Sequence, residues 1–273
     1  MDTPATIDRS FGLGLARALA GAVIFGLPLF MTMEMWWLGI AMEPARLALF
    51  LALFFPFLVA LSWHVGFEPT FSWTDDVLDA LVALAVGFTC SALLLAVMGV
   101  LTRELTLREV VGQVAVQSVP ASIGALLAQS MLGEDSAGAA VRGGASSYGS
   151  ELFIMAVGAL FLAFNVAPTQ EMQLIALRMD AVHSLLLALG SLAVMHAFVF
   201  GVSFRGSHAE PAPAWSLFLR FTVVGYAIAL LLGAYLLWTF GRLEGASAAS
   251  ALKMVVVLGL PASVGAAAAR LIL

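Results

Sequence analysis

Charged side chains are scarce in this sequence. Only 11% of its 273 residues are Asp, Glu, Lys or Arg, and 62% are hydrophobic. A typical soluble domain has about 25% charged and about 45–50% apolar residues. A water-soluble globule of this size could not cover so much apolar surface, so the composition excludes a soluble protein. It predicts that the lipid bilayer is the solvent of this chain.

Other features are also missing. The single cysteine, Cys90, excludes an intramolecular disulfide. A net charge of −5 argues against a nucleic-acid partner and against a basic lipid-headgroup anchor. The sequence contains no P-loop, no GxSxG, no HExxH and no His/Cys cluster at metal-site spacing. We therefore predict that the protein is not an enzyme and binds no cofactor, while the identity of any bound metal is left open.

Long apolar runs dominate what remains. In lipid every backbone N–H and C=O must be paired inside the protein, which allows only helices or closed barrels. Barrel strands would be about ten residues long with alternating polarity, whereas these runs are longer and unbroken. The sequence therefore predicts an all-α, polytopic membrane bundle. A span needs about 20 residues, and we predict eight spans, at about 14–40, 45–65, 77–101, 110–132, 150–177, 181–203, 216–240 and 249–272.

The chain resembles itself. The sequence TMEM at 32–35 recurs as TQEM at 169–172, which is 137 residues later (169 − 32). Likewise PASIGA at 120–125 returns as PASVGA at 261–266, which is 141 residues later (261 − 120). Ordered matches at a nearly constant offset indicate a duplication. The alternative is coincidence in a sequence dominated by Ala, Leu and Val.

The duplication predicts two tandem four-helix repeats, 1–132 and 150–273, joined by a Gly/Ser-rich linker at 133–149. Because four is an even number, both repeats enter the membrane in the same orientation. They would be related by a parallel pseudo-two-fold axis along the membrane normal. Membrane orientation stays open, since the predicted spans leave six Lys or Arg residues on each side.

Two glutamates are the clearest candidates for chemistry. Glu34 and Glu171 are predicted to lie inside apolar helices, about two turns from the helix end. A charged side chain at a helix centre costs about 2.5–3.5 kcal/mol, so it normally faces a wet cavity or a partner. The pseudo-two-fold axis would place the two acids at equivalent positions facing each other, where they favour a shared cation or a shared proton.

Threonine and proline residues accompany both glutamates. Thr32 and Thr169 each stand two residues before the acid, and Pro28 and Pro168 precede them. Proline frees a helix carbonyl, and carbonyl and hydroxyl oxygens can bind a cation. The alternative is that each glutamate extends to the interface, with Trp36 in an ordinary aromatic belt.

Further polar residues lie on the same predicted helices. Ser122 and Ser263 in the duplicated PAS motif could line a pathway, although close helix packing by small residues is the favoured explanation. Asn165 could join a polar site or bridge helices. Gln113 and Gln117 share one face of the fourth predicted span, because they stand four residues apart. The eighth span has Met254 near these positions, so this polar stripe is not duplicated.

The stretch NVAPTQE at 165–171, with the length and the eight predicted spans, resembles an uncharacterised family of bacterial integral membrane proteins, described only as a domain of unknown function. The resemblance covers most of the chain, implies a multi-pass protein of the cell (inner) membrane, and brings no activity. The Thr/Pro/Glu motifs also resemble, distantly, the duplicated acidic motifs of cation/calcium exchangers. Those repeats are inverted, so no residue roles are carried over.

These observations predict a cation channel or a cation/proton transporter. Glu34 and Glu171 would bind the cation or proton, with Thr32 and Thr169 as auxiliary ligands. The expected partners are the lipid bilayer and a small cation or proton, and a homo-oligomer is compatible with the sequence. One alternative is a non-transporting membrane scaffold or assembly protein that uses the small-residue helix faces. Another is an anion or small-solute carrier, whose lumen would be lined by Arg or neutral polar groups.

Overall fold

The computed structural model describes residues 4–65, 72–132, 147–198 and 213–272, and every regular element in these stretches is a helix. The chain divides into two units, Met1–Gly144 and Ala145–Leu273, each of which is described by itself. The division falls inside the predicted linker, of which residues 133–146 lie outside the described ranges.

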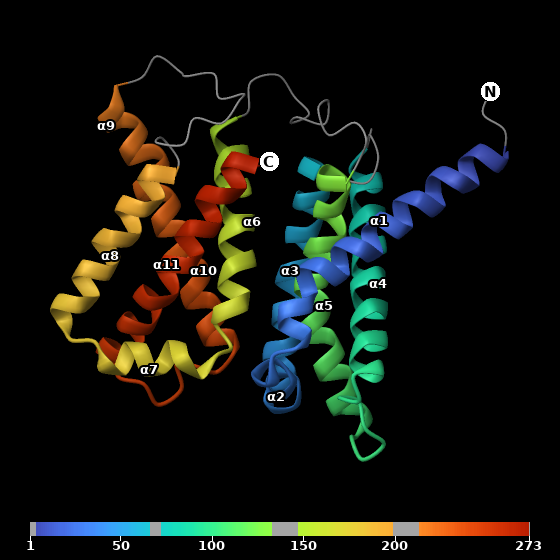
Figure 1. Ribbon diagram of the computed structural model, residues 1–273, viewed down its shortest axis with the longest axis horizontal. Coiled ribbons are helices and arrows are strands. Elements are labelled where there is room, and N and C mark those ends of the chain that lie inside the picture. Colours follow the sequence, from blue (N-terminus) through green and yellow to red (C-terminus); the bar gives the residue numbers. More distant parts are fainter. Residues whose placement is uncertain (1–3, 66–71, 133–146, 199–212, 273) are drawn as a thin grey trace. The chain divides into compact units, whose positions relative to one another are not determined.

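Unit 1 contains five helices in the described residues (Figure 1). They are α1 (Pro4–Phe30), α2 (Met33–Ala41), α3 (Pro44–Val65), α4 (Trp73–Val97) and α5 (Leu107–Leu132). The nine-residue α2 stands between two long apolar helices. In unit 1, therefore, one short helix separates the first long helix from the second.

Unit 2 repeats this order of long and short helices. Its elements are α6 (Tyr148–Val166), α7 (Gln170–Arg178), α8 (Ala181–His196), α9 (Ala214–Leu217), the π-helical segment η2 (Phe218–Val223), α10 (Val224–Thr239) and α11 (Ala248–Ile272). α9, η2 and α10 follow one another without a gap and form one long rod. The nine-residue α7 occupies the place in unit 2 that α2 occupies in unit 1.

Seven helices in the described ranges are long and apolar enough to cross a membrane. Four of them, α1, α3, α4 and α5, belong to unit 1. In unit 2 they are α6, the α9–α10 rod and α11, while α8 is a shorter apolar helix over Ala181–His196. The predicted polytopic helical membrane architecture is therefore confirmed; the eighth span is not.

Each unit is built around its last helix. α5 packs against α1, α2, α3 and α4, and α11 packs against α6, α7, α8 and α10. Glycines let backbones meet in both places: a Cβ on Gly124 of α5 would lie 2.5 Å from the Gly21 carbonyl oxygen of α1. A Cβ on Gly265 of α11 would lie 2.1 Å from the Gly158 carbonyl oxygen of α6. The small residues of the duplicated PAS motifs are thus used inside the units, for close helix packing.

Two predicted spans are wrong. The span 14–40 is interrupted after Phe30, and the span 150–177 is interrupted after Val166. Hydropathy could not reveal the first break, because α2 is as apolar as the helix before it. Backbone features mark both breaks: Thr32 and Thr169 adopt extended backbone angles at the start of α2 and α7, and Pro168, which lacks an N–H, follows the end of α6. Pro28 lies inside α1, in its last turn.

The predicted span 181–203 begins with α8 at Ala181, but its end lies outside the described residues. The boundaries of the remaining spans differ by at most four residues from those expected. α4 begins at Trp73 instead of 77, because Ser72 and Asp75 form a capping box in which the Ser72 N–H donates to Asp75 Oδ2 at 3.1 Å. The chain leaves α4 and α10 through Gly99 and Gly241, which have φ of 73° and 69°. Such angles favour glycine because it has no Cβ.

Candidate functional site

Glu34 lies in the first turn of α2, and its side chain is half-buried. The apolar span of α1 before it covers Gly12–Phe30, 19 residues. At 1.5 Å per residue this is about 28 Å, close to the thickness of a bilayer core. The helix before the break is therefore long enough to cross a bilayer core by itself. The predicted position two turns inside a continuous span is wrong.

Side chains close the α1–α2 break. Thr32 Oγ1 donates to the Pro28 carbonyl oxygen at 2.6 Å, and Trp36 Nε1 donates to the Phe30 carbonyl oxygen at 2.7 Å. These bonds satisfy carbonyls that the end of α1 leaves without a helical partner. Because Thr32 uses its hydroxyl hydrogen, the lone pairs of its oxygen stay available as acceptors.

Glu171 has the matching position in unit 2. It lies in the first turn of α7, after a span of 19 residues over Tyr148–Val166, and its side chain is exposed. Thr169 Oγ1 donates to the Val166 carbonyl oxygen at 2.8 Å, which repeats the role of Thr32. In both units a carboxylate thus stands in the first turn of a short helix that follows a long apolar one.

Two cationic side chains donate hydrogen bonds to backbone carbonyl oxygens at the two ends of α7. Arg242 donates from Nη2 to the Pro168 carbonyl oxygen just before the helix, and Lys253 Nζ donates to the Met179 carbonyl oxygen just after it at 2.5 Å. In unit 1 the comparable contact is neutral: Gln113 Nε2 of α5 donates to the Trp36 carbonyl oxygen at 3.3 Å. Both short helices are therefore tied to the helix at the centre of their unit or to the turn before it.

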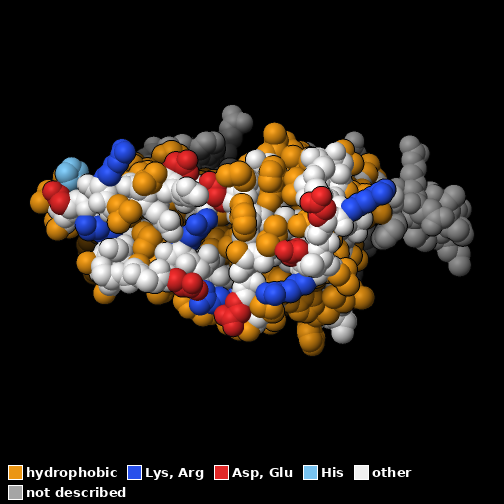
Figure 2. All heavy atoms as spheres, turned by 90° about the horizontal axis from the view of Figure 1, so that it is seen from below, with side chains coloured by type: hydrophobic (Ala, Val, Ile, Leu, Met, Phe, Trp, Pro, Cys, Tyr) orange, Lys and Arg blue, Asp and Glu red, His pale blue; other side chains and the backbone are white. Residues whose placement is uncertain are grey.

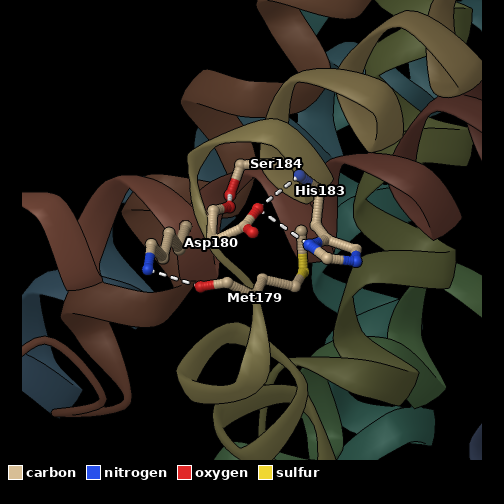
Figure 3. A network of polar contacts seen from close by, with 5 residues as sticks. Met179, Asp180, His183 and Ser184 are labelled. Carbon is tan, nitrogen blue, oxygen red and sulfur yellow. Dashed lines mark hydrogen bonds and ion pairs between the residues drawn. The ribbon is translucent and has the colours of Figure 1, made fainter.

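The turn after α7 is a compact polar network (Figure 3). Asp180 Oδ1 accepts from the backbone N–H of His183 at 2.9 Å and contacts His183 Nδ1 at 2.8 Å, while Ser184 Oγ donates to the Asp180 carbonyl oxygen. The hydrogen bond from the His183 backbone lowers the pKa of Asp180. In unit 1 Arg46 Nε and Glu43 Oε2 form the equivalent pair at 3.7 Å, again three residues apart.

Charged side chains gather at this end of each unit. Figure 2 views the molecule from below and shows acidic and basic groups scattered among hydrophobic ones on this face. The mixture is typical of a membrane boundary, where helix ends and turns leave the hydrocarbon region. The predicted convergence of Glu34 and Glu171 stays a prediction.

The other predicted site residues bond within their own helices. Asn165 Nδ2 donates to the Phe161 carbonyl oxygen at 2.8 Å. Ser122 Oγ donates to the Ser118 carbonyl oxygen at 2.6 Å, and Ser263 Oγ to the Leu260 carbonyl oxygen at 2.8 Å. Both serines are fully buried, and Ser122 lies against Gly87 of α4, where a Cβ would be 2.3 Å from its Oγ. These contacts favour the packing interpretation of the PAS motif.

Sequence reasoning missed one ion pair of unit 2. Glu151 in α6 accepts from Arg270 of α11, with Oε2 2.8 Å from Nη2 and 2.9 Å from Nε. The guanidinium also lies over the Phe221 ring, 3.9 Å from its centroid. No signal in the sequence links these residues, because 119 positions separate the acid from the base.

No group of three or more His, Cys, Asp or Glu side chains that could hold a metal ion occurs in the residues described above. An acid-rich site for a divalent ion is therefore absent from these parts of the chain.

Residues 14–273 match the family described as "Putative integral membrane protein (DUF2391)". The chain belongs to this family. Its membership, together with the apolar helices, confirms a multi-pass integral membrane protein in contact with the bilayer. No curated protein and no solved structure matches the chain. The family description carries no activity, so a function has to be argued from the residues themselves.

Proposed function

We propose that the protein transports a small cation or a proton, and that Glu34 and Glu171 are the carboxylates that attract and bind it at the polar ends of the two units. One observation carries this proposal. Each unit has a nine-residue helix after a proline- and threonine-marked break, with a glutamate as its second residue. The glutamate-bearing helix thus recurs at corresponding positions of the two halves, and transporters built from repeats form their binding sites from corresponding elements.

The proposal includes two tandem four-helix repeats with the same orientation, if α8 is counted as a span. Matching contacts support the duplication. The pair Gly21–Gly124 corresponds to Gly158–Gly265 at offsets of 137 (158 − 21) and 141 (265 − 124), the offsets of the sequence motifs. The ion pair of Glu43 likewise corresponds to that of Asp180. Coincidental Ala and Leu matches would not reproduce contacts.

Electrostatics favour a cation over an anion. Both glutamates stand in the first turn of a short helix, and carboxylate oxygens attract cations and repel anions. An anion carrier would need free positive groups near the site, but Arg242 and Lys253 already donate to carbonyl oxygens at the ends of α7. The oxygens of Thr32 and Thr169 keep lone pairs for a cation, because both hydroxyls donate to their own helix.

The scaffold alternative is less well supported. It requires the small-residue faces of α5 and α11 to be free for a partner. Gly124 and Gly265 instead contact α1 and α6 inside their units. A partner would have to use other surfaces, for which the sequence contains no specific motif.

The test is cation flux through the purified full-length protein in liposomes. Uptake of radioactive sodium, rubidium and calcium is measured, with a pH-sensitive dye for protons. We expect Glu34→Gln and Glu171→Gln each to lower flux at least tenfold and the double variant to abolish it. The matched control is Glu104→Gln with Glu244→Gln, two exposed glutamates in the turns before α5 and α11. Undiminished flux in a correctly folded double variant would overturn the proposal.

A further inference from the structure

Two glutamine side chains are buried in the interior of unit 1. Gln113 and Gln117 lie one turn apart on α5, within the membrane span Leu107–Ala128, and their exposed fractions are 2% and 0%. A Cβ on Gly39 of α2 would lie 2.3 Å from the Gln113 Cα, so the short helix packs directly on this part of α5. Both amides are therefore shielded from bulk water, and Gln113 is adjacent to the helix that carries Glu34.

Three polar atoms of these amides have no hydrogen-bond partner in the described part of the chain. They are Gln113 Oε1, Gln117 Oε1 and Gln117 Nε2. The Gln113 amide has a defined orientation, because its Nε2 donates to the Trp36 carbonyl oxygen. Leaving such atoms unpaired in an apolar interior costs free energy, and an ordered water or ion is the usual explanation.

The two unpaired amide oxygens can bind a cation. Gln113 Oε1 and Gln117 Oε1 are neutral carbonyl-type oxygens, and neither accepts a hydrogen bond within the described residues. The nearby serines of α5 are used differently: Ser122 Oγ donates to the Ser118 carbonyl oxygen, on the side of the helix that faces Gly87 of α4. Neutral oxygens of this kind are a favourable environment for a cation.

The chemistry of these groups selects the class of ion. Divalent cations are usually held by carboxylates, and neither glutamine has one. Glutamine has no group that titrates, which excludes a proton. Neutral carbonyl-type oxygens replace the hydration shell of monovalent ions in selective channels. A partly hydrated monovalent ion offers a partner of the right kind for each of the three atoms: the metal for the two amide oxygens, and the oxygen of a bound water for the Gln117 Nε2 donor.

We infer that Gln113 and Gln117 form a binding site for a partly dehydrated monovalent metal cation inside unit 1. The inference rests on the proposed function and names its substrate class: the ion that Glu34 attracts to α2 would meet the two amides next. The site belongs to unit 1 alone, since the corresponding residues of α11, at an offset of 141, are Met254 and Leu258.

The first experiment measures binding without transport. The melting temperature of the purified full-length protein in detergent is recorded with sodium, potassium or rubidium chloride, and with N-methylglucamine chloride at equal ionic strength. We expect at least one of the metal cations to raise the melting temperature of the wild type and of Gln173→Leu, a control at a half-buried amide on α7. We expect Gln117→Leu and the Gln113→Leu/Gln117→Leu double variant to show no such increase.

The second experiment measures flux in liposomes. Gln117→Leu should lower sodium or rubidium flux at least tenfold, and Gln117→Glu should restore flux while admitting calcium. Wild-type-like monovalent flux and ion stabilisation in a folded Gln117→Leu protein would overturn the inference, and the amides would then hold only water. If the wild type shows no flux but keeps the Gln117-dependent stabilisation, the proposed function fails and the ion site stands.

Discussion

The two units share a layout and differ in the chemistry of their interiors. Both have a short helix after a threonine-marked break, a central last helix, and glycines where that helix meets the first one. The centre of unit 1 contains Gln113 and Gln117, whereas Met254 and Leu258 occupy the corresponding places in unit 2. Unit 2 instead has cations at both ends of its short helix.

The comparison teaches which parts of a membrane unit are constrained. Backbone contacts at glycines leave no room for a side chain, so both units need the same small residues there. The interior positions about two and three turns away accept either an amide or an aliphatic side chain. One unit can therefore hold a polar site while the other keeps an apolar interior within the same architecture.

Exchanging the interior residues should have the largest effect on stability. We expect Leu258→Gln to destabilise the protein by about 2–5 kcal/mol, because it removes a fully buried aliphatic group and buries an amide without a prepared partner. In buffer without metal cations, Gln117→Leu should leave stability unchanged or increase it. Reversible unfolding in mixed micelles measures both. Equal destabilisation by the two changes would remove the distinction between the interiors.

Adding a methyl group at the glycine contacts should lower the stability of the protein somewhat less than Leu258→Gln does, and by the same amount in both units. We expect Gly124→Ala and Gly265→Ala each to destabilise by about 1–3 kcal/mol, since the new Cβ would press on a backbone carbonyl oxygen of α1 or α6. Gly190→Ala is the control, because nothing lies within 4 Å of its Cβ position. Markedly unequal costs, measured by the same unfolding assay, would contradict an equivalent packing of the two units.

The ion pair between Glu151 and Arg270 is a further difference between the two units. Arg270→Gln removes the bonds to Glu151 and the contact with Phe221. We expect a loss of roughly 1–3 kcal/mol, reduced by partial exposure of both side chains. Arg103→Gln, at an exposed position in the turn after α4, should be neutral. Unit 1 has Gly14 at the position corresponding to Glu151, so this stabilisation is specific to unit 2.

The smallest expected effect concerns Asp180. Its pKa is lowered in the folded protein, so the charged form contributes stability above its unfolded pKa, and this contribution is lost as the pH falls through the folded pKa. Asp180→Asn should therefore melt slightly below the wild type at neutral pH and together with it in acid. A difference that persists at low pH would show that the charge is not the cause.

Apolar runs were enough to predict most helices. The predicted 249–272 and 45–65 differ by one residue from α11 and α3, because Pro44 and polar turns bound these runs. The apolar pattern did not predict the break after Phe30, because Met33, Trp36 and Leu38 continue that pattern. Only the proline–threonine spacing signals the break. Long-range contacts cannot be read from such patterns. The bond from Arg242 to Pro168 joins residues 74 positions apart and depends on the completed fold.

That bond has a consequence for how the protein is made. Arg242 and Lys253 each donate to a carbonyl 74 residues earlier in the chain, one at either end of α7. During synthesis, α6 and α7 therefore leave the ribosome well before the groups that satisfy their ends, and water or headgroups must solvate those carbonyls in the interval. A nascent chain that stops before Arg242 would lack both donors, so unit 2 acquires its final form only when its last helix has been inserted.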